Sequence, residues 1–269
     1  MAASANFLLA WQNLADLATL DSSSSIAEGL PLANLQTRLL SDGCRFLDPA
    51  DAVIDVDLGA PRKIGFAGLF GHNGSEAAEQ RLRCADSQAE LDSDPTYDSA
   101  WGPVWPPFAD VPSTQAAVTA RWARLEMRDA GNPDGFLEIG RLWLADPWIG
   151  RRNYAYGTAL GFDDPSGQEA ARGAQVHVFE EEGARVLDVP LPWVSENEVF
   201  GVIARLQRLV GRRKDVVLLL SPDDQTWRLE KTIIGTIETM SLPVQVSHGL
   251  AAAGGPRWEV KLRIRESVV

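Results

Sequence analysis

The chain has few of the residue types that build metal sites and catalytic centres. Its 269 residues include two Cys and three His, and Lys is scarce beside Arg. Cys44 and Cys84 stand at no metal-ligand spacing. Their number fits free thiols in a protein assembled inside a cell, with one disulfide as the alternative. The three scattered histidines, His72, His177 and His248, match no zinc motif, so we expect no metal and no cofactor.

Export and membrane signals are also missing from the sequence. The first twenty residues have no basic region and contain Gln12 and Asp16, which is not the pattern of a signal peptide. No apolar run approaches the roughly 20 residues of a membrane helix. The net charge is −12, and the basic clusters 151–152 and 212–214 are too short to form a nucleic-acid-binding face. We expect a soluble protein that folds without export, does not span a membrane and does not bind nucleic acid.

Motifs of enzymes are absent as well: there is no G-x-S-x-G, phosphate loop or dinucleotide fingerprint. The carboxylate pair Asp55/Asp57 and the acidic runs 180–182 and 223–224 lie on predicted strand faces or turns, so we interpret them as solvated surface. His72 could act as a general base, but we favour a histidine that hydrogen-bonds a turn. We therefore predict that the chain is not an enzyme; a cell-wall hydrolase is the least favoured hypothesis.

What the sequence does contain is a strong β pattern. Residues 52–58 alternate apolar and polar side chains, as a half-buried strand does. Further strands are predicted at 64–70, 81–85, 122–127 and 137–144. The last two flank a turn-rich segment in which Asp129, Asn132 and Asp134, with Glu138 after it, are oxygen ligands that Ca²⁺ accepts. We favour turn and strand-cap duty for these residues.

The second half has a different pattern. Residues 147–173 have weak periodicity and read as a linker or long loop, followed by strands at 174–179 and 184–189 that an acidic turn joins. Ser195 and Glu198 form a capping box for a helix near 196–210, which buries an apolar face and ends at Gly211. Strands are expected at 216–220, 232–238 and 258–266, with a long loop at 239–256. We predict two domains, 1–148 and 149–269.

Two groups of residues are candidates for contacts with partners. The Pro-rich run 97–107 carries Tyr97, Trp101 and Trp105, which could stack on sugars; the alternative is a loop that closes the end of the first domain. The second group is a strand that points its apolar side chains one way and is a candidate for sheet pairing within the subunit or with a neighbouring subunit. Its apolar residues are Trp258, Val260, Leu262 and Ile264.

Short motifs along both halves resemble those of bacteriophage tail-tip proteins, whose first domain is a discoidin-like (galactose-binding-like) jelly-roll sandwich. In the first half, over residues 6–148, they are 34–37, 54–59, 71–73, 97–101, 124–127 and 132–142. In the second half they are 208–211, 216–223, 234–235 and 258–266.

The resemblance implies a mainly β protein: a jelly-roll sandwich followed by a smaller β-rich α+β domain with one amphipathic helix. It implies a structural virion component, made in the host bacterial cytoplasm, that forms a homo-oligomeric ring of three or six copies and joins the tail tube to hub, tip or fibre proteins. Discoidin relatives often bind glycans and some hold Ca²⁺, but no ligand residue matches position by position. The alternative function is therefore a carbohydrate-binding module that attaches to a host-surface glycan.

Overall fold

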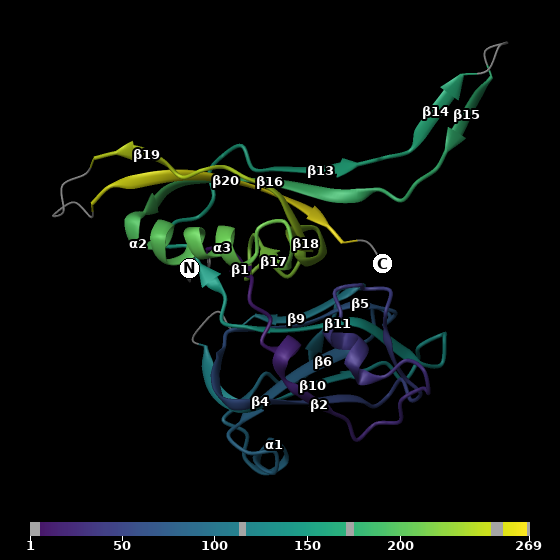
Figure 1. The fold of residues 1–269 in the computed structure, drawn as a ribbon. Coiled ribbons are helices and arrows are strands. Elements are labelled where there is room, and N and C mark those ends of the chain that lie inside the picture. Colours follow the sequence, from purple (N-terminus) through teal and green to yellow (C-terminus); the bar gives the residue numbers. More distant parts are fainter. Residues whose placement is uncertain (1–5, 113–116, 171–174, 249–254, 268–269) are drawn as a thin grey trace. The chain divides into compact units, whose positions relative to one another are not determined.

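The computed structural model describes residues 6–112, 117–170, 175–248 and 255–267. By its contacts the chain forms two compact units. The first contains residues 1–148 and 219–232, and the second contains 149–218 and 233–268. Figure 1 gives the element labels used below. The predicted division into domains 1–148 and 149–269 stays a prediction.

The first unit is a sandwich of two antiparallel sheets. One sheet has the order β2–β4–β10–β6–β7, with β8 also paired to β6. These strands are β2 (Thr19–Asp21), β4 (Ala52–Ile64), β10 (Val118–Arg128), β6 (Glu79–Ala85), β7 (Tyr97–Asp98) and β8 (Gly102–Pro103). The other sheet has the order β3–β11–β5–β9. Its strands are β3 (Cys44–Phe46), β11 (Leu137–Ala145), β5 (Phe66–His72) and β9 (Phe108–Pro112).

Alternating apolar side chains from both sheets fill the sandwich core. Leu125 on β10 lies opposite Ile54 on β4 and Leu82 on β6, and all three are buried. Cys44 and Cys84 are free and buried, as expected, and burial raises the pKa of each thiol to about 12. The remaining elements of this unit are short: β1 (Leu8–Ala10), η1 (Ala15–Leu17), η2 (Leu32–Gln36), α1 (Glu90–Ser93) and α4 (Arg228–Lys231).

The outer face of the larger sheet is charged, and one prediction about it was wrong. Asp55 and Asp57 do point away from the core, but Asp55 is only 4% exposed. Arg124 from β10 pairs with Asp55, and Arg121 pairs with Asp57 at 2.8 Å. Cross-strand arginines therefore cover carboxylates that the sequence pattern assigns to solvent, because alternation alone does not show what the neighbouring strand brings.

The second unit contains a sheet with the order β17–β18–β20–β16–β13, and β19 also pairs with β20. Its strands are β17 (Asp215–Leu219), β18 (Thr232–Met240), β20 (Arg257–Glu266), β16 (Ala184–Ser195), β13 (Ala159–Asp163) and β19 (Val244–Ser247). Residues 148–149 form the short strand β12 (Trp148–Ile149). Among the described residues, no helix is both long and apolar enough to cross a membrane.

The predicted helix is confirmed, with one irregular turn. It runs through α2 (Glu196–Glu198), η3 (Val199–Ile203) and α3 (Ala204–Leu209), and the η3 segment has π geometry. The Ser195 hydroxyl accepts the backbone N–H of Glu198, whose carboxylate accepts the Ser195 N–H. At the other end Gly211 has φ +52°, the left-handed conformation that suits glycine after a helix. The predicted apolar face is buried: Val199, Ile203, Leu206 and Val210.

Three other predictions for the second half were wrong. The expected loop 147–173 contains β13 and β14 (Gly167–Ala170), and the expected loop 239–256 contains β19. Strand β15 (Val176–Phe179) pairs with β14, whereas β16 pairs with β13, so the strands on either side of the acidic turn are not each other's partners. Strands β13 and β14 are exposed and lie in a stretch of weak periodicity, so they were missed, whereas β15 lies within the predicted strand 174–179.

The mainly β fold class, with an antiparallel sandwich followed by a β-rich part with one amphipathic helix, is confirmed.

Candidate functional site

The three aromatic residues of the predicted sugar-binding rim have different surroundings. Tyr97, on β7, packs against the sandwich core, and burial raises the pKa of its phenol. The Arg128 guanidinium lies 4.0 Å from the centre of the Trp101 ring, and that of Arg81 lies 5.9 Å away. Ion pairs to Glu79 and Asp98 hold these arginines in place. Tyr97 and Trp101 are therefore engaged within the protein, and contact of either with a sugar stays a prediction.

Trp105 is the aromatic residue of this run that borders a hollow. Its indole N–H donates to the Gln225 carbonyl oxygen at 3.1 Å, and the Arg228 guanidinium lies 5.6 Å from its ring centre. The hollow beside it has a volume of about 340 Å³. Besides Trp105, its polar lining consists of Gln80, Ser99, Asp110, Asp223 and Gln225. An indole next to carboxylate, amide and hydroxyl groups is the combination that binds the apolar face and the hydroxyls of a sugar ring.

A buried ion pair borders this hollow, because Asp110 belongs to its lining. Asp110 on β9 and Arg228 on α4 are 3% and 2% exposed. The Arg228 Nε donates to Asp110 Oδ1 at 2.9 Å, and another guanidinium nitrogen donates to the Pro222 carbonyl oxygen. Burial raises the pKa of Asp110, and the guanidinium opposes that shift. The pair fastens segment 219–232, which carries Asp223 and Gln225, to the sandwich.

Sequence reasoning missed this part of the site. Asp110 and Arg228 are 118 residues apart, and neither belongs to a recognisable motif. The turn at 222–224 was predicted, and the Asp224 N–H donates to the Ser221 carbonyl at 3.0 Å. Nothing in the local pattern indicates that this turn lies beside Trp105. The structure identifies this pair because both charged groups are buried. The sequence does not show burial, since burial depends on tertiary packing.

His72 lies near another turn of the sandwich, and its surroundings fit the turn interpretation. The side chain is buried, and the Gly74 N–H donates to its Nδ1 at 3.1 Å. Burial lowers the His72 pKa to about 4, so the imidazole is neutral at pH 7. A base of such low pKa is poorly matched to proton abstraction near neutral pH.

The oxygen-rich turn nearby also has a structural role. The Asp129 carboxylate accepts the Ser75 N–H at 2.7 Å, the Ser75 hydroxyl at 3.0 Å and the Asn132 amide at 3.1 Å. Asp134 accepts from Asn73, and Glu138 pairs with Arg45. Within the described ranges, no group of three or more His, Cys, Asp or Glu side chains is arranged to hold a metal. The predicted turn and strand-cap duty is confirmed by these hydrogen bonds.

The candidate interface strand lies inside the sheet of the second unit. Strand β20 pairs with β16 on one side and with β18 and β19 on the other. Val260, Leu262 and Ile264 are buried, and Trp258 packs edge-on against Phe200 with ring centres 5.9 Å apart. Of the two predicted kinds of sheet pairing, the structure shows pairing within the subunit, since both backbone edges of β20 are occupied along most of its length. A role of these side chains at a subunit interface stays a prediction.

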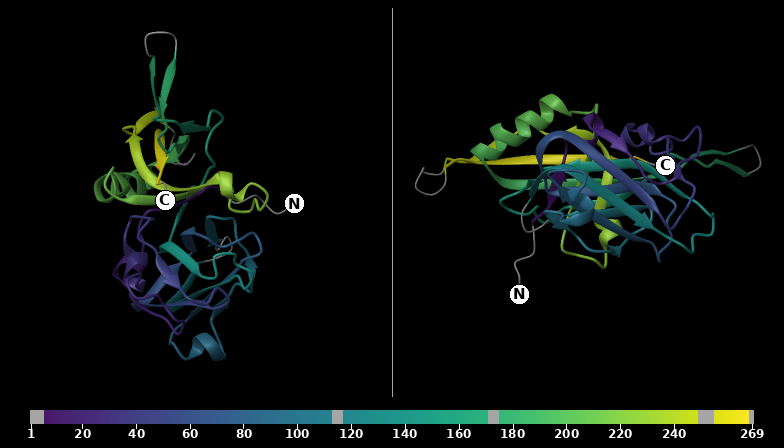
Figure 2. Two further views of the ribbon diagram at one scale, coloured as in Figure 1. Left: turned by 90° about the vertical axis from the view of Figure 1, so that its right-hand side faces the viewer. Right: turned by 90° about the horizontal axis from the view of Figure 1, so that it is seen from below.

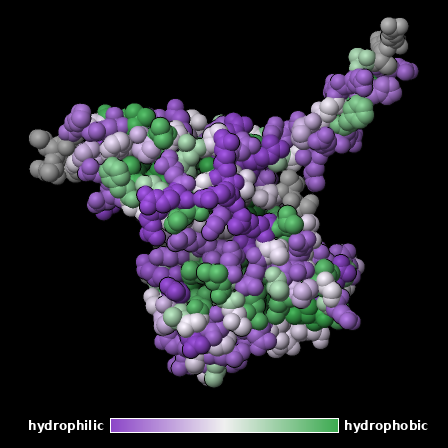
Figure 3. All heavy atoms as spheres, viewed as in Figure 1, coloured by the Kyte–Doolittle hydropathy of each residue, from purple (hydrophilic) through white to green (hydrophobic). Residues whose placement is uncertain are grey.

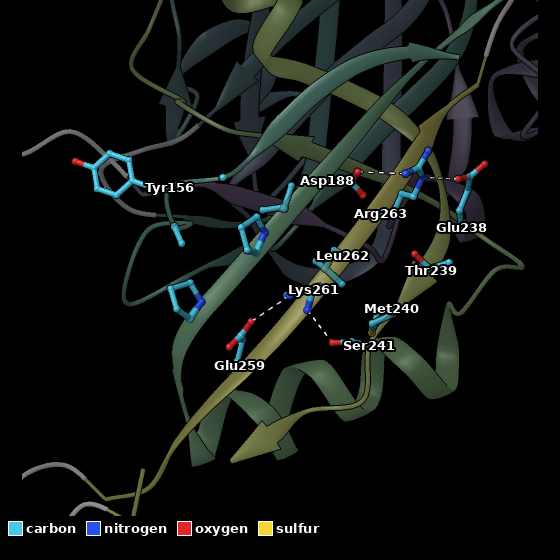
Figure 4. Close-up of a pocket in the computed structure, with 15 residues that line it drawn as sticks. Tyr156, Asp188, Glu238, Thr239, Met240, Ser241, Glu259, Lys261, Leu262 and Arg263 are labelled. Carbon is cyan, nitrogen blue, oxygen red and sulfur yellow. Dashed lines mark hydrogen bonds and ion pairs between the residues drawn. The ribbon is translucent and has the colours of Figure 1, made fainter. Parts of the chain in front are cut away.

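A wide hollow of about 1110 Å³ lies over the same sheet, on the side that carries the charged residues of β20. Figure 4 shows Arg263 between Asp188 and Glu238, with contacts of 3.2 and 3.0 Å. Lys261 lies 3.6 Å from Glu259. These cations and anions neutralise one another, so this face has no strong net charge to attract a charged ligand.

Several exposed apolar side chains of the second unit lie on the strands β13, β14 and β15. We call strands β13, β14 and β15 with the connecting segment 180–183 the arm. Figures 1 and 2 show β14 and β15 extending beyond the sheet to which β13 and β16 belong, and Figure 3 shows apolar residues among polar ones along them. Between 50% and 68% of each of its five large apolar residues is exposed: Leu160, Phe162, Val176, Val178 and Phe179.

The register places these side chains on both faces of the arm. Val176 and Val178 pair with Ala170 and Gln168 on one face, while Phe179 pairs with Gly167 and points to the other. The Phe162 ring lies so close to Gly183 that a Cβ there would meet it at 2.1 Å, yet Phe162 stays 68% exposed. A two-stranded hairpin is only marginally stable in water unless another surface covers it.

Comparisons with known proteins give structural likeness alone. No family model and no curated protein matches the chain. A carbohydrate-binding module, CBM32-1, from a family 31 glycoside hydrolase of Clostridium perfringens shares 11% identity, covers 51% of this chain and 99% of its own, and has a TM-score of 0.40. The lectin domain of lectinolysin, complexed with Lewis B antigen, shares 16% identity over 49% of this chain and 95% of its own, with a TM-score of 0.37.

A fucose-binding module of Streptococcus pneumoniae shares 10% identity over 49% of this chain and 96% of its own, with a TM-score of 0.37. At these TM-scores we transfer no ligand from those proteins, and the side chains described above carry the functional argument.

Proposed function

We propose that the chain is a structural protein that works as a homo-oligomer, and that it is not an enzyme. The observation that supports this function best is the arm. Five large apolar side chains on a two-stranded extension are at least half exposed. Leaving them in water costs free energy, roughly 25 cal/mol for each Å² that a partner could bury. An assembly in which a second subunit covers the arm removes that cost.

The particular assembly we propose is a phage tail tip or baseplate. The support is the resemblance of both halves to distal tail proteins, which implies a ring of three or six copies in the virion between the tail tube and the hub or fibre proteins. A ring needs two different patches on each subunit, repeated around an axis. The extended arm is suited to be one of those patches.

The test is the mass of the full chain in solution. Native mass spectrometry and sedimentation velocity from low to high micromolar concentration should detect a closed oligomer, of three or six copies if the distal-tail interpretation holds. Replacing residues 164–182 with a short Gly-Ser turn between β13 and β16 should give a folded monomer. A natural chain that remains monomeric at every concentration would contradict the proposal. Electron microscopy of particles that carry the labelled protein tests its place in a tail.

A second candidate function is glycan binding at the Trp105 hollow. The observation that favours it is the indole beside Ser99, Asp223 and Gln225 in a 340 Å³ space. A glycan array would identify the glycan that the protein binds best. Isothermal titration with that glycan should give saturable binding that Trp105→Ala abolishes. Trp101→Ala is the matched control, because Arg128 lies over that ring. Equal loss in both variants, or no binding by the natural chain, would count against this site.

A further inference from the structure

The second unit carries two exposed segments of opposite character. Phe179 is followed by Glu180, Glu181 and Glu182, and all four side chains are exposed. At the end of α3, Gly211 is followed by Arg212, Arg213 and Lys214, which are exposed too. We call residues 179–182 the acidic segment and 211–214 the basic segment.

The basic segment borders an apolar hollow. A space of about 320 Å³ is lined by Gly211, Arg212, Ile237, Met240 and their neighbours Gln207 and Thr239. Ile237 is buried and Met240 is partly buried, so the hollow has an apolar wall with Arg212 at its rim. Phe179, followed by three glutamates, offers this surface an apolar ring for the hollow and negative charge for the arginines beside it.

Helix stabilisation explains only part of this positive charge. Cations near a helix C-terminus interact favourably with its dipole, and the Arg213 guanidinium donates to the Arg208 carbonyl oxygen at 2.9 Å. Arg205 and Arg208 add two more exposed cations on the same helix. Five cations within residues 205–214 of a chain with net charge −12 form a local field of opposite sign, which favours an acidic partner.

The two segments cannot meet within one chain. Both belong to the second unit, where Figure 1 shows the segment that connects β15 to β16 well separated from the end of α3. A contact between them therefore joins two copies. Since the surfaces differ, the contact is heterologous, and repetition of it generates a ring if the rotation closes.

We propose that the acidic segment of one copy docks on the basic segment of the next, with Phe179 entering the hollow beside Met240. This inference rests on the proposed homo-oligomer and names its two contacting surfaces. Electrostatic attraction orients the arm, and burial of Phe179 supplies apolar contact area.

The experiment is a charge reversal in both directions, performed on the full chain. Glu180→Lys/Glu181→Lys/Glu182→Lys and, separately, Arg212→Glu/Arg213→Glu/Lys214→Glu should each weaken self-association at least about tenfold, because like charges then face one another. A chain that carries all six changes should regain most of the affinity. Glu28→Lys/Asp42→Lys/Glu76→Lys, three exposed acids of the sandwich, is the matched control and should leave the oligomer unchanged.

A second measurement identifies the contact directly and does not depend on affinity. A chain with Glu181→Cys mixed with one carrying Lys214→Cys should form a covalent dimer on mild oxidation, and far more of it than either chain alone. The docking is overturned if neither charge reversal weakens self-association, or if the chain with six changes associates no more tightly than the chains with three. Either result leaves the proposed oligomer intact. A natural chain that never self-associates overturns both.

Discussion

The sandwich and the arm differ in which side chains they bury and which they expose. In the sandwich, charged groups are buried and partnered, as Asp110 is with Arg228 and Asp55 with Arg124. On the arm, apolar groups such as Phe162 and Val176 are exposed. A buried charge with an ion-pair partner needs no further contact, whereas a group of exposed apolar side chains often marks a surface that binds a partner. The sandwich therefore pairs these buried charges within one chain, whereas the arm leaves apolar side chains exposed, which is the observation behind the proposed oligomer.

The largest effect is expected from the buried ion pair of the sandwich. Asp110→Ala leaves the Arg228 guanidinium buried without its carboxylate, so we expect a loss of about 3–5 kcal/mol in the free energy of unfolding. Denaturant unfolding, with amide hydrogen exchange of β9 as a local probe, measures it. Asp110→Leu with Arg228→Leu removes both charges and should recover most of the loss. A cost below about 1 kcal/mol for Asp110→Ala would mean that water reaches the pair.

A pH-dependent loss of stability should also come from the sandwich. The folded His72 pKa is about 4, below its ordinary value of 6.5. Below pH 6.5 the unfolded chain therefore binds a proton that the folded chain does not, so stability falls as the pH drops from 6.5 to 4. One pKa unit is worth 1.36 kcal/mol, which gives a loss of about 3 kcal/mol over that range. His72→Asn should flatten this part of the stability–pH curve. An unchanged curve would show that other groups cause the slope.

A smaller effect is expected at the helix of the second unit. Ser195→Ala removes the hydroxyl that accepts the Glu198 N–H, and N-cap losses are typically about 1 kcal/mol. Thermal unfolding followed by helical circular dichroism measures the change. Ser195→Asp, which keeps an acceptor at the N-cap, is the control and should stay near the natural stability. A larger loss in the aspartate variant than in the alanine variant would contradict the capping role.

The smallest effect on stability is expected on the arm. Val176→Ser with Val178→Ser changes side chains that are 56% and 52% exposed, so the free energy of unfolding of the monomer should move by no more than about 0.5 kcal/mol. Self-association should nevertheless weaken, which sedimentation velocity detects. In the sandwich, Leu125→Ala should have the opposite effects. The core cavity lowers the free energy of unfolding by about 2–5 kcal/mol, but self-association is retained at temperatures where the variant stays folded. Equal stability losses in the two variants would remove the contrast between the regions.

Strands whose two faces meet different surroundings could be predicted from the sequence. Residues 52–58 and 258–266 alternate because one face of each strand is apolar and the other is charged. The helix was predictable for a similar reason: its capping box and its apolar face are local patterns. In the arm, β15 was predicted within the strand 174–179, whereas β13 and β14 were missed because both of their faces are exposed and the periodicity of that stretch is weak. The π turn in η3 was missed because the same apolar face fits an ordinary α-helix.

The candidate site shows the same division. Trp105 was visible as part of an unusual aromatic run, and the acidic and basic segments were visible as charge clusters. The sequence by itself determined the mainly β class, the helix and the alternating strands, because these depend on contacts between near neighbours. Tertiary structure alone decided that Arg228 pairs with Asp110 next to Trp105, that Arg124 covers Asp55, and that the apolar side chains of the arm are exposed. Burial and long-range pairing depend on contacts between residues far apart in the chain, so local sequence patterns cannot predict them.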